Sequence, residues 1–89
     1  MKYSFEVRIE ASENRRKIID NNVNCAIEVI EAMIDRTVEK GYFDFTVNLG
    51  NFLQDFGTKI KEEITDYLSI YGYKVNWTGS YIKVSFEEG

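Results

Sequence analysis

The sequence predicts an α+β domain of two layers, in which two main helices pack on one face of a mixed four-stranded sheet in the order βαβαββ. Three observations support this fold class. Residues 3–9 alternate apolar and polar side chains, two longer stretches carry apolar side chains at helical spacing, and residues 73–86 alternate again around a glycine. With 89 residues and a mass of 10.4 kDa, the chain fits a single domain, residues 1–89.

The first element is predicted from a strict alternation near the N-terminus. Its apolar side chains are Tyr3, Phe5, Val7 and Ile9, and charged or polar residues fill the positions between them. Because successive side chains of a strand point to opposite faces, this pattern predicts a strand with one face in water.

A long amphipathic helix is predicted next, over residues 12–40. Apolar side chains recur every three or four positions from Ile19 to Val38, and Gly41 is a typical helix stop. Such a helix would be about 43 Å long at 1.5 Å per residue. A seven-residue strand covers only about 23 Å, so the helix either overhangs the sheet or breaks.

The charges near the start of this helix favour a break. If the helix begins at Ser12, then Arg15, Arg16 and Lys17 lie close to the positive end of its dipole, which is unfavourable. Placed at the end of a short first helix, the same three cations are favourable. We therefore expect a break or kink near residues 20–22, although the apolar stripe keeps its phase there.

The second half of the chain repeats the strand–helix order and ends in a hairpin. Residues 42–49 alternate as a strand, and a second helix is predicted from Asn51 to a stop at Gly72. The first strand–helix–strand unit is expected to be a right-handed crossover between parallel strands. A turn at Gly79-Ser80 would close the hairpin. It pairs Trp77 with Ile82, Val75 with Val84, and Tyr73 with Phe86.

Composition excludes several classes of function. The chain has no histidine, which rules out histidine-based catalysis and histidine-ligated metals, and a single cysteine cannot form an internal disulfide. The net charge of −4 disfavours a nucleic-acid partner, because the phosphate backbone is itself negative. No apolar run is long enough for a membrane span, and the N-terminal residues do not resemble a secretory signal. Together with the lone cysteine, these features predict a cytoplasmic protein.

The closing stretch resembles the end of many small early or accessory proteins of tailed bacteriophages. The similarity lies in Tyr71-Gly72-Tyr73-Lys74-Val75 after a helix, followed by a hairpin that ends in residues 82–87. It covers about a third of the chain. The resemblance implies a viral protein that binds a host protein, including inhibitors of host defence, and it assigns no functional residue.

The main candidate site is a row of carboxylates on the first long helix: Glu28, Glu31, Asp35 and Glu39. Steps of three and four residues put them on one helix face, about one charge per turn. Such a row can imitate nucleic-acid phosphates and occupy a nucleic-acid-binding protein. It can also be the solvated face that any long amphipathic helix needs. Three tyrosines, Tyr42, Tyr71 and Tyr81, are expected to be exposed and are candidate partner-binding anchors.

No catalytic constellation is visible. The sequence contains no nucleophile–base pair, no metal-ligand spacing and no phosphate-binding loop, so we predict no enzyme, no metal and no cofactor. The leading hypothesis is a small binding protein that occupies a host protein. One alternative is an assembly protein that forms a homodimer or larger homo-oligomer. Another is a binder of nucleic acid or nucleotide that uses the open face of the sheet.

Overall fold

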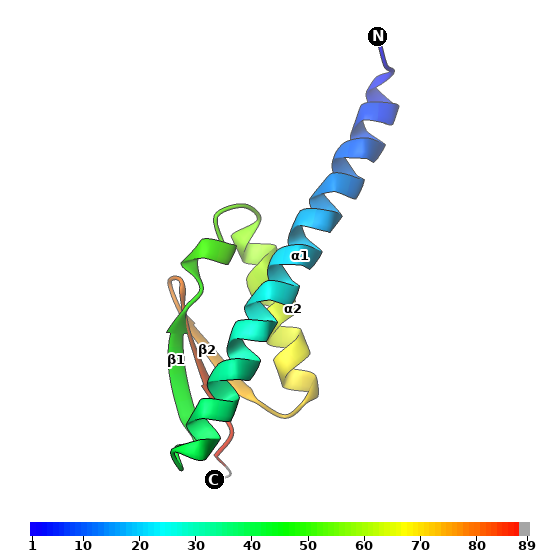
Figure 1. Ribbon diagram of the computed structural model, residues 1–89. Helices are drawn as coiled ribbons and strands as arrows, with labels where there is room; N and C mark the ends of the chain where they lie inside the picture. Colours follow the sequence, from blue (N-terminus) through cyan, green and yellow to red (C-terminus); the bar gives the residue numbers. More distant parts are fainter. Residues whose placement is uncertain (88–89) are drawn as a thin grey trace.

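A long helix leads into a small α+β body in the computed structural model, which describes residues 1–87 (Figure 1). The elements are α1 (Ser4–Glu39), β1 (Asp44–Asn48), the 3-10 turn η1 (Gly50–Phe52), α2 (Gly57–Ile70), β2 (Lys74–Thr78) and β3 (Tyr81–Ser85). The three strands form an antiparallel sheet in the order β1-β3-β2. Both helices lie on the same side of this sheet (Figure 1).

The predicted first strand was wrong, because residues 4–9 belong to α1. The predicted four-stranded mixed sheet and its parallel crossover were therefore wrong too, since the sheet has three antiparallel strands. The chain has no glycine before Gly41 and no proline, so nothing in residues 4–39 ends a helix. At its start, the Tyr3 amide donates a hydrogen bond to the Glu6 carboxylate at 3.3 Å, and Lys2 pairs with Glu10 at 2.7 Å.

The predicted break near residues 20–22 was also wrong, because α1 is continuous from Ser4 to Glu39. Since the helix begins at Ser4, the basic run at residues 15–17 lies several turns inside it, where the dipole has little effect. Arg16 also has two acidic partners. Its guanidinium donates to the Glu63 carboxylate of α2 at 2.7 and 2.8 Å and to Asp20 at 2.9 Å. These hydrogen bonds, the one to Glu63 first, raise the pKa of Arg16 above its usual value.

The N-terminal part of α1 extends beyond the rest of the molecule, so the helix overhangs the sheet rather than breaking (Figure 1). Residues 4–18, which we call the projecting half, are all exposed, and at their C-terminal end Arg15 and Arg16 contact Phe56 and Glu63. The molecule measures 59 × 22 × 20 Å. The radius of gyration of 16.0 Å exceeds the roughly 12 Å expected of a compact chain of this length. Apolar side chains that were expected in a core, such as Phe5 and Ile9, are 56% and 55% exposed.

The C-terminal hairpin was predicted correctly. Trp77 faces Ile82 and Val75 faces Val84 across β2 and β3, and Gly79 adopts a positive φ of 61° in the turn. The ring centroids of Tyr73 and Phe86 lie 6.0 Å apart just beyond the paired strands. β1 pairs with the other edge of β3, which makes β3 the central strand.

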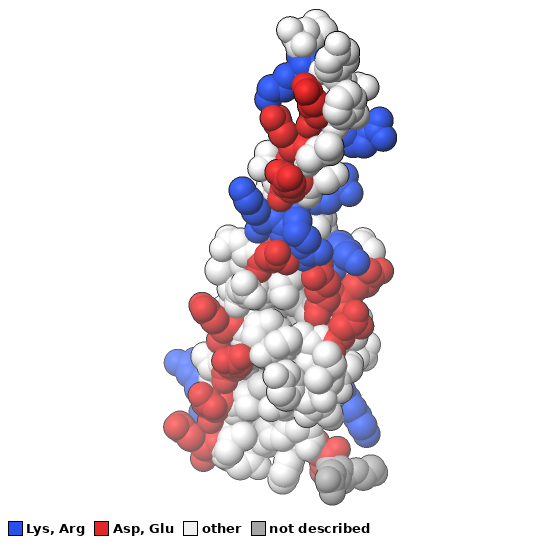
Figure 2. Space-filling model, turned by 90° about the vertical axis from the view of Figure 1, so that its right-hand side faces the viewer, with Lys and Arg blue, Asp and Glu red and all other residues white. Residues whose placement is uncertain are grey.

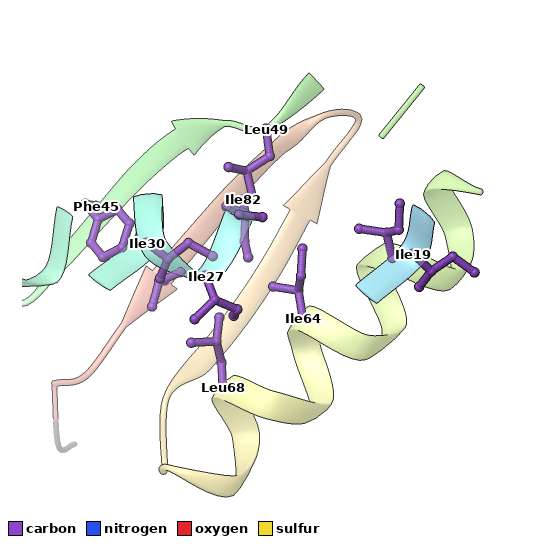
Figure 3. Packing of buried hydrophobic residues seen from close by; sticks show 11 residues of the cluster. Ile19, Ile27, Ile30, Phe45, Leu49, Ile64, Leu68 and Ile82 are labelled. Carbon is purple, nitrogen blue, oxygen red and sulfur yellow. The ribbon is translucent and has the colours of Figure 1, made fainter. Parts of the chain in front are cut away.

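The second helix begins later than predicted. Asn51 lies in η1, and α2 begins at Gly57, after Phe56 with a φ of 60°. A single core then joins α1, α2 and the sheet (Figure 3). Its buried side chains are Ile19, Ala26, Ile27, Ile30, Phe45, Leu49, Ile60, Ile64, Leu68, Ile82 and Val84. This packing fixes α1 against the C-terminal end of α2, which positions the site described next.

Candidate functional site

The four carboxylates predicted from the sequence form a row on the solvent side of α1. Glu28, Glu31, Asp35 and Glu39 are all exposed, and we call them the acidic row. Figure 2 shows acidic side chains along one edge of the lower half of the molecule, beside a broad uncharged area. None of the four carboxylates forms an ion pair with a lysine or arginine of residues 1–87. Their charge therefore faces solvent.

The structure brings one member of the acidic row to one of the predicted tyrosines. Glu31 and Tyr71 line the same hollow between α1 and the end of α2, and the hollow has a volume of about 400 Å³. We call it the tyrosine hollow. Its complete lining is Glu31, Ile34, Tyr67, Leu68, Tyr71 and Tyr73. Forty residues separate Glu31 from Tyr71, so only the packing of α1 on α2 places them together.

Aromatic rings continue from this hollow to the edge of the sheet. The ring centroids of Tyr67 and Tyr71 are 5.2 Å apart, with planes inclined by 55°. Tyr73 meets Phe86 edge-on at 6.0 Å, and Phe86 meets Phe43 at 6.3 Å. Such tilted aromatic pairs are favourable packing arrangements. Since Tyr67 and Tyr71 are 38% and 65% exposed, their rings remain available to a partner.

The negative charge of the hollow comes from the Glu31 carboxylate. The nearby Tyr71, desolvation and the Glu31 carboxylate raise the pKa of the Tyr67 hydroxyl above its usual value, in that order of size. A raised phenol pKa means that the neutral hydroxyl persists to higher pH than in a free tyrosine. At neutral pH the Tyr67 ring is therefore a neutral phenol in a hollow that also contains the Glu31 carboxylate.

The other two predicted tyrosines lie outside the hollow. Tyr81 is exposed at the start of β3, next to the hairpin turn, whereas Tyr73 lies at the opposite end of β2. Tyr42 is exposed in the turn after α1, where its amide donates to the Thr37 carbonyl at 3.0 Å. Of the three predicted anchors, Tyr71 alone lines the tyrosine hollow.

Sequence reasoning did not name Tyr67 or Tyr73 as candidate partner-binding residues, although both line the hollow. Their spacing carried a usable signal. Tyr67 and Tyr71 are four residues apart at the end of a helix, and Tyr73 follows the helix-stopping Gly72. Three tyrosines within seven residues at a helix end are concentrated enough to suggest an aromatic surface.

A second hollow, of about 420 Å³, lies where the projecting half meets the start of α2. It is lined by cationic side chains, Arg15, Arg16 and Lys59, together with Phe56. The Arg15 guanidinium carbon lies 5.4 Å from the centre of the Phe56 ring. The chain therefore supplies its own cation to this aromatic ring.

Metal-binding and membrane-spanning features are not found within residues 1–87. No group of three acidic or cysteine side chains there is close enough to hold a metal ion, and Cys25 is a free, partly buried thiol. Neither helix in that part of the chain combines the length and the apolar character that a membrane span requires. Comparisons with protein-family models, curated proteins and solved structures find no match to this chain.

Proposed function

We propose that the chain is a non-enzymatic binding protein that occupies a basic surface of a partner protein through the acidic row and the adjoining tyrosine hollow. One observation carries this proposal: four exposed carboxylates without an ion-pair partner in residues 1–87 form a row, and one of them, Glu31, adjoins exposed tyrosine rings. Opposite charge attracts the partner and fixes its orientation, whereas exposed aromatic rings contribute buried contact area.

The spacing of the acidic row favours a partner that handles nucleic acid. One carboxylate per helical turn gives a charge about every 5.4 Å over roughly 16 Å of helix. A protein that binds phosphates presents lysine and arginine side chains to a similar line of negative charge. We extend the proposal to a phage-encoded inhibitor of a host nucleic-acid-processing or defence protein. It would act in the host cytoplasm, a compartment that suits one free cysteine.

The acidic row is tested by reversing three of its charges. The variant Glu28→Lys/Glu31→Lys/Asp35→Lys is expected to lose its partner, because each lysine repels the basic surface. The measurement is capture by tagged protein from bacterial lysate, with and without nuclease, read by mass spectrometry. The partner of the wild-type chain should survive nuclease treatment and become weaker as salt concentration rises.

A control variant with the same change in net charge distinguishes an effect of the acidic row from an effect of net charge alone. Asp55→Lys/Glu62→Lys/Asp66→Lys alters three exposed carboxylates outside the row and is expected to retain the partner. Equal capture by the row variant and the control would contradict the proposal. Loss of the wild-type partner on nuclease treatment would instead indicate a nucleic-acid ligand.

A homo-oligomer is the second candidate, and the projecting half is the observation that favours it. Phe5 and Ile9 continue the apolar stripe of the buried Ile19, yet nothing in residues 1–87 covers them. Because isolated helical segments are marginally stable in water, a second copy would stabilise this half by covering its apolar side chains. Light scattering distinguishes the candidates: a dimer that Phe5→Ser/Ile9→Ser converts to monomer supports assembly, and a monomeric wild type contradicts it.

A further inference from the structure

Two aromatic hollows on the surface each hold a cation from the chain itself. In the hollow at the start of α2, Arg15 lies over the Phe56 ring at 5.4 Å. In the hollow at Trp77, Lys61 Nζ lies 5.3 Å from the ring centre and donates to the Gly79 carbonyl at 2.6 Å. Both arrangements are favourable because the face of an aromatic ring attracts positive charge.

The tyrosine hollow differs from these two in its charge. No lysine or arginine of residues 1–87 lies over its rings, and the ionisable side chain in its lining besides the tyrosines is the carboxylate of Glu31. The electron-rich faces of Tyr67 and Tyr71 and this carboxylate all favour a cation. The hollow therefore has the electrostatics of a cation-binding site, and residues 1–87 place no cation in it.

We propose that an arginine side chain of the partner protein fills the tyrosine hollow. This inference rests on the proposed function, in which the partner surface is basic. Arginine fits better than lysine, because its planar guanidinium stacks on a tyrosine ring while forming two parallel hydrogen bonds with a carboxylate. Ile34 and Leu68 supply apolar contact for the methylene groups of its stem.

The volume of the hollow agrees with an occupant of this size. About 400 Å³ is at the small end of ligand-binding pockets and suits one long side chain better than a folded element. The hollow is also open to solvent at the exposed rings of Tyr67 and Tyr71. An arginine on a partner surface can therefore enter without unfolding of α2.

The test uses three blocked peptides, Gly-Arg-Gly, Gly-Lys-Gly and Gly-citrulline-Gly, titrated into the full chain and followed by NMR. Citrulline has nearly the shape of arginine but no charge. The arginine peptide is expected to shift the ring resonances of Tyr67, Tyr71 and Tyr73 and to bind more tightly than the lysine peptide. The citrulline peptide should show no saturable binding. Equal shifts with arginine and citrulline would overturn the inference.

Two exposed positions in the hollow provide variants that should fold. Glu31→Gln removes the negative charge of the hollow and is expected to weaken arginine binding about fivefold. This is the effect expected for losing an ion pair that is accessible to solvent. Tyr71→Ala removes a ring and should weaken it about threefold, whereas Tyr71→Phe keeps the ring and should change little. The matched control Tyr81→Ala alters an exposed tyrosine outside the hollow. Unchanged binding by both Glu31→Gln and Tyr71→Ala would contradict the proposal.

Failure of this inference can be distinguished from failure of the proposed function. If the arginine peptide does not bind the hollow, but capture of the partner still depends on Glu28 and Asp35, then only the hollow's role is wrong. If charge reversal of the acidic row leaves capture unchanged, the proposed function is wrong, whatever the peptides do. If Tyr71→Ala reduces both peptide binding and capture, both proposals are supported.

Discussion

Ile30→Ala is expected to destabilise the protein by about 2–5 kcal/mol, the range for removing most of a buried isoleucine. Ile30 is fully buried at the centre of the core, where side chains of α1, α2 and the sheet converge (Figure 3). The lost stability is the sum of the transfer free energy of the removed carbons and the free-energy cost of the cavity that they leave. The total free energy of unfolding of a domain is only about 5–15 kcal/mol. The substitution would therefore remove a large part of the protein's stability.

The matched control lies on the same helix. Ile9→Ala removes the same atoms from a side chain that is 55% exposed in the projecting half, and we expect a change below about 1 kcal/mol. Urea denaturation followed by circular dichroism gives both free energies of unfolding. Similar losses for the two variants would mean that Ile9 is covered, either by the chain itself or by a second copy.

Proline substitution at two exposed asparagines of α1 tests which part of the helix the body needs. Asn24→Pro is expected to cost about 3 kcal/mol or more, because it breaks the helix where α1 packs on the core. Asn14→Pro makes the same chemical change in the projecting half. It should reduce the helical circular dichroism signal, yet change the free energy of unfolding of the body by less than about 0.5 kcal/mol.

Hydrogen exchange provides the second readout for this pair. In Asn14→Pro, amides before residue 14 should exchange rapidly, while those around Ile30 keep their wild-type protection. Equal destabilisation by the two prolines would contradict the separation of α1 into a packed part and a projecting half.

Local patterns predicted those parts of the fold in which neighbouring segments pair with each other. The hairpin register follows from alternation on both sides of Gly79, because the turn sets which residues face each other. The stripe from Ile19 to Val38 predicted the packed part of α1, because its spacing persists through several turns. Both predictions depend on contacts close in sequence or on a long, regular period.

The error at residues 3–9 has a physical cause. A seven-residue alternation fits a strand, but Phe5 and Ile9 are also one helical turn apart and in phase with Ile19. A glycine or proline between Ile9 and Ile19 would have ended the first element before the following helix began. The sequence has neither residue there, so the helix continues through both segments. The exposure of this segment could not be predicted, because a short apolar pattern does not reveal whether anything covers it.

The candidate site was predictable as separate parts but not as an arrangement. The spacing of the acidic row placed its carboxylates on one helix face, and the structure keeps them there, exposed. The meeting of Glu31 with Tyr71 depends on how α1 packs against α2, which no local pattern encodes. Tyr42 and Tyr81 are exposed as expected but lie apart from the hollow, because the turn after α1 and the start of β3 hold them elsewhere.

Carboxylate footprinting of the chain with its captured partner tests the acidic row most directly. Carbodiimide coupling of a small amine labels exposed carboxylates, and mass spectrometry locates each labelled residue. Binding is predicted to protect Glu28, Glu31 and Asp35, while Glu10 and Glu13 of the projecting half label as in the free chain. Protection confined to the projecting half, with the acidic row labelled fully, would contradict the account and assign the interface to the other end of the molecule.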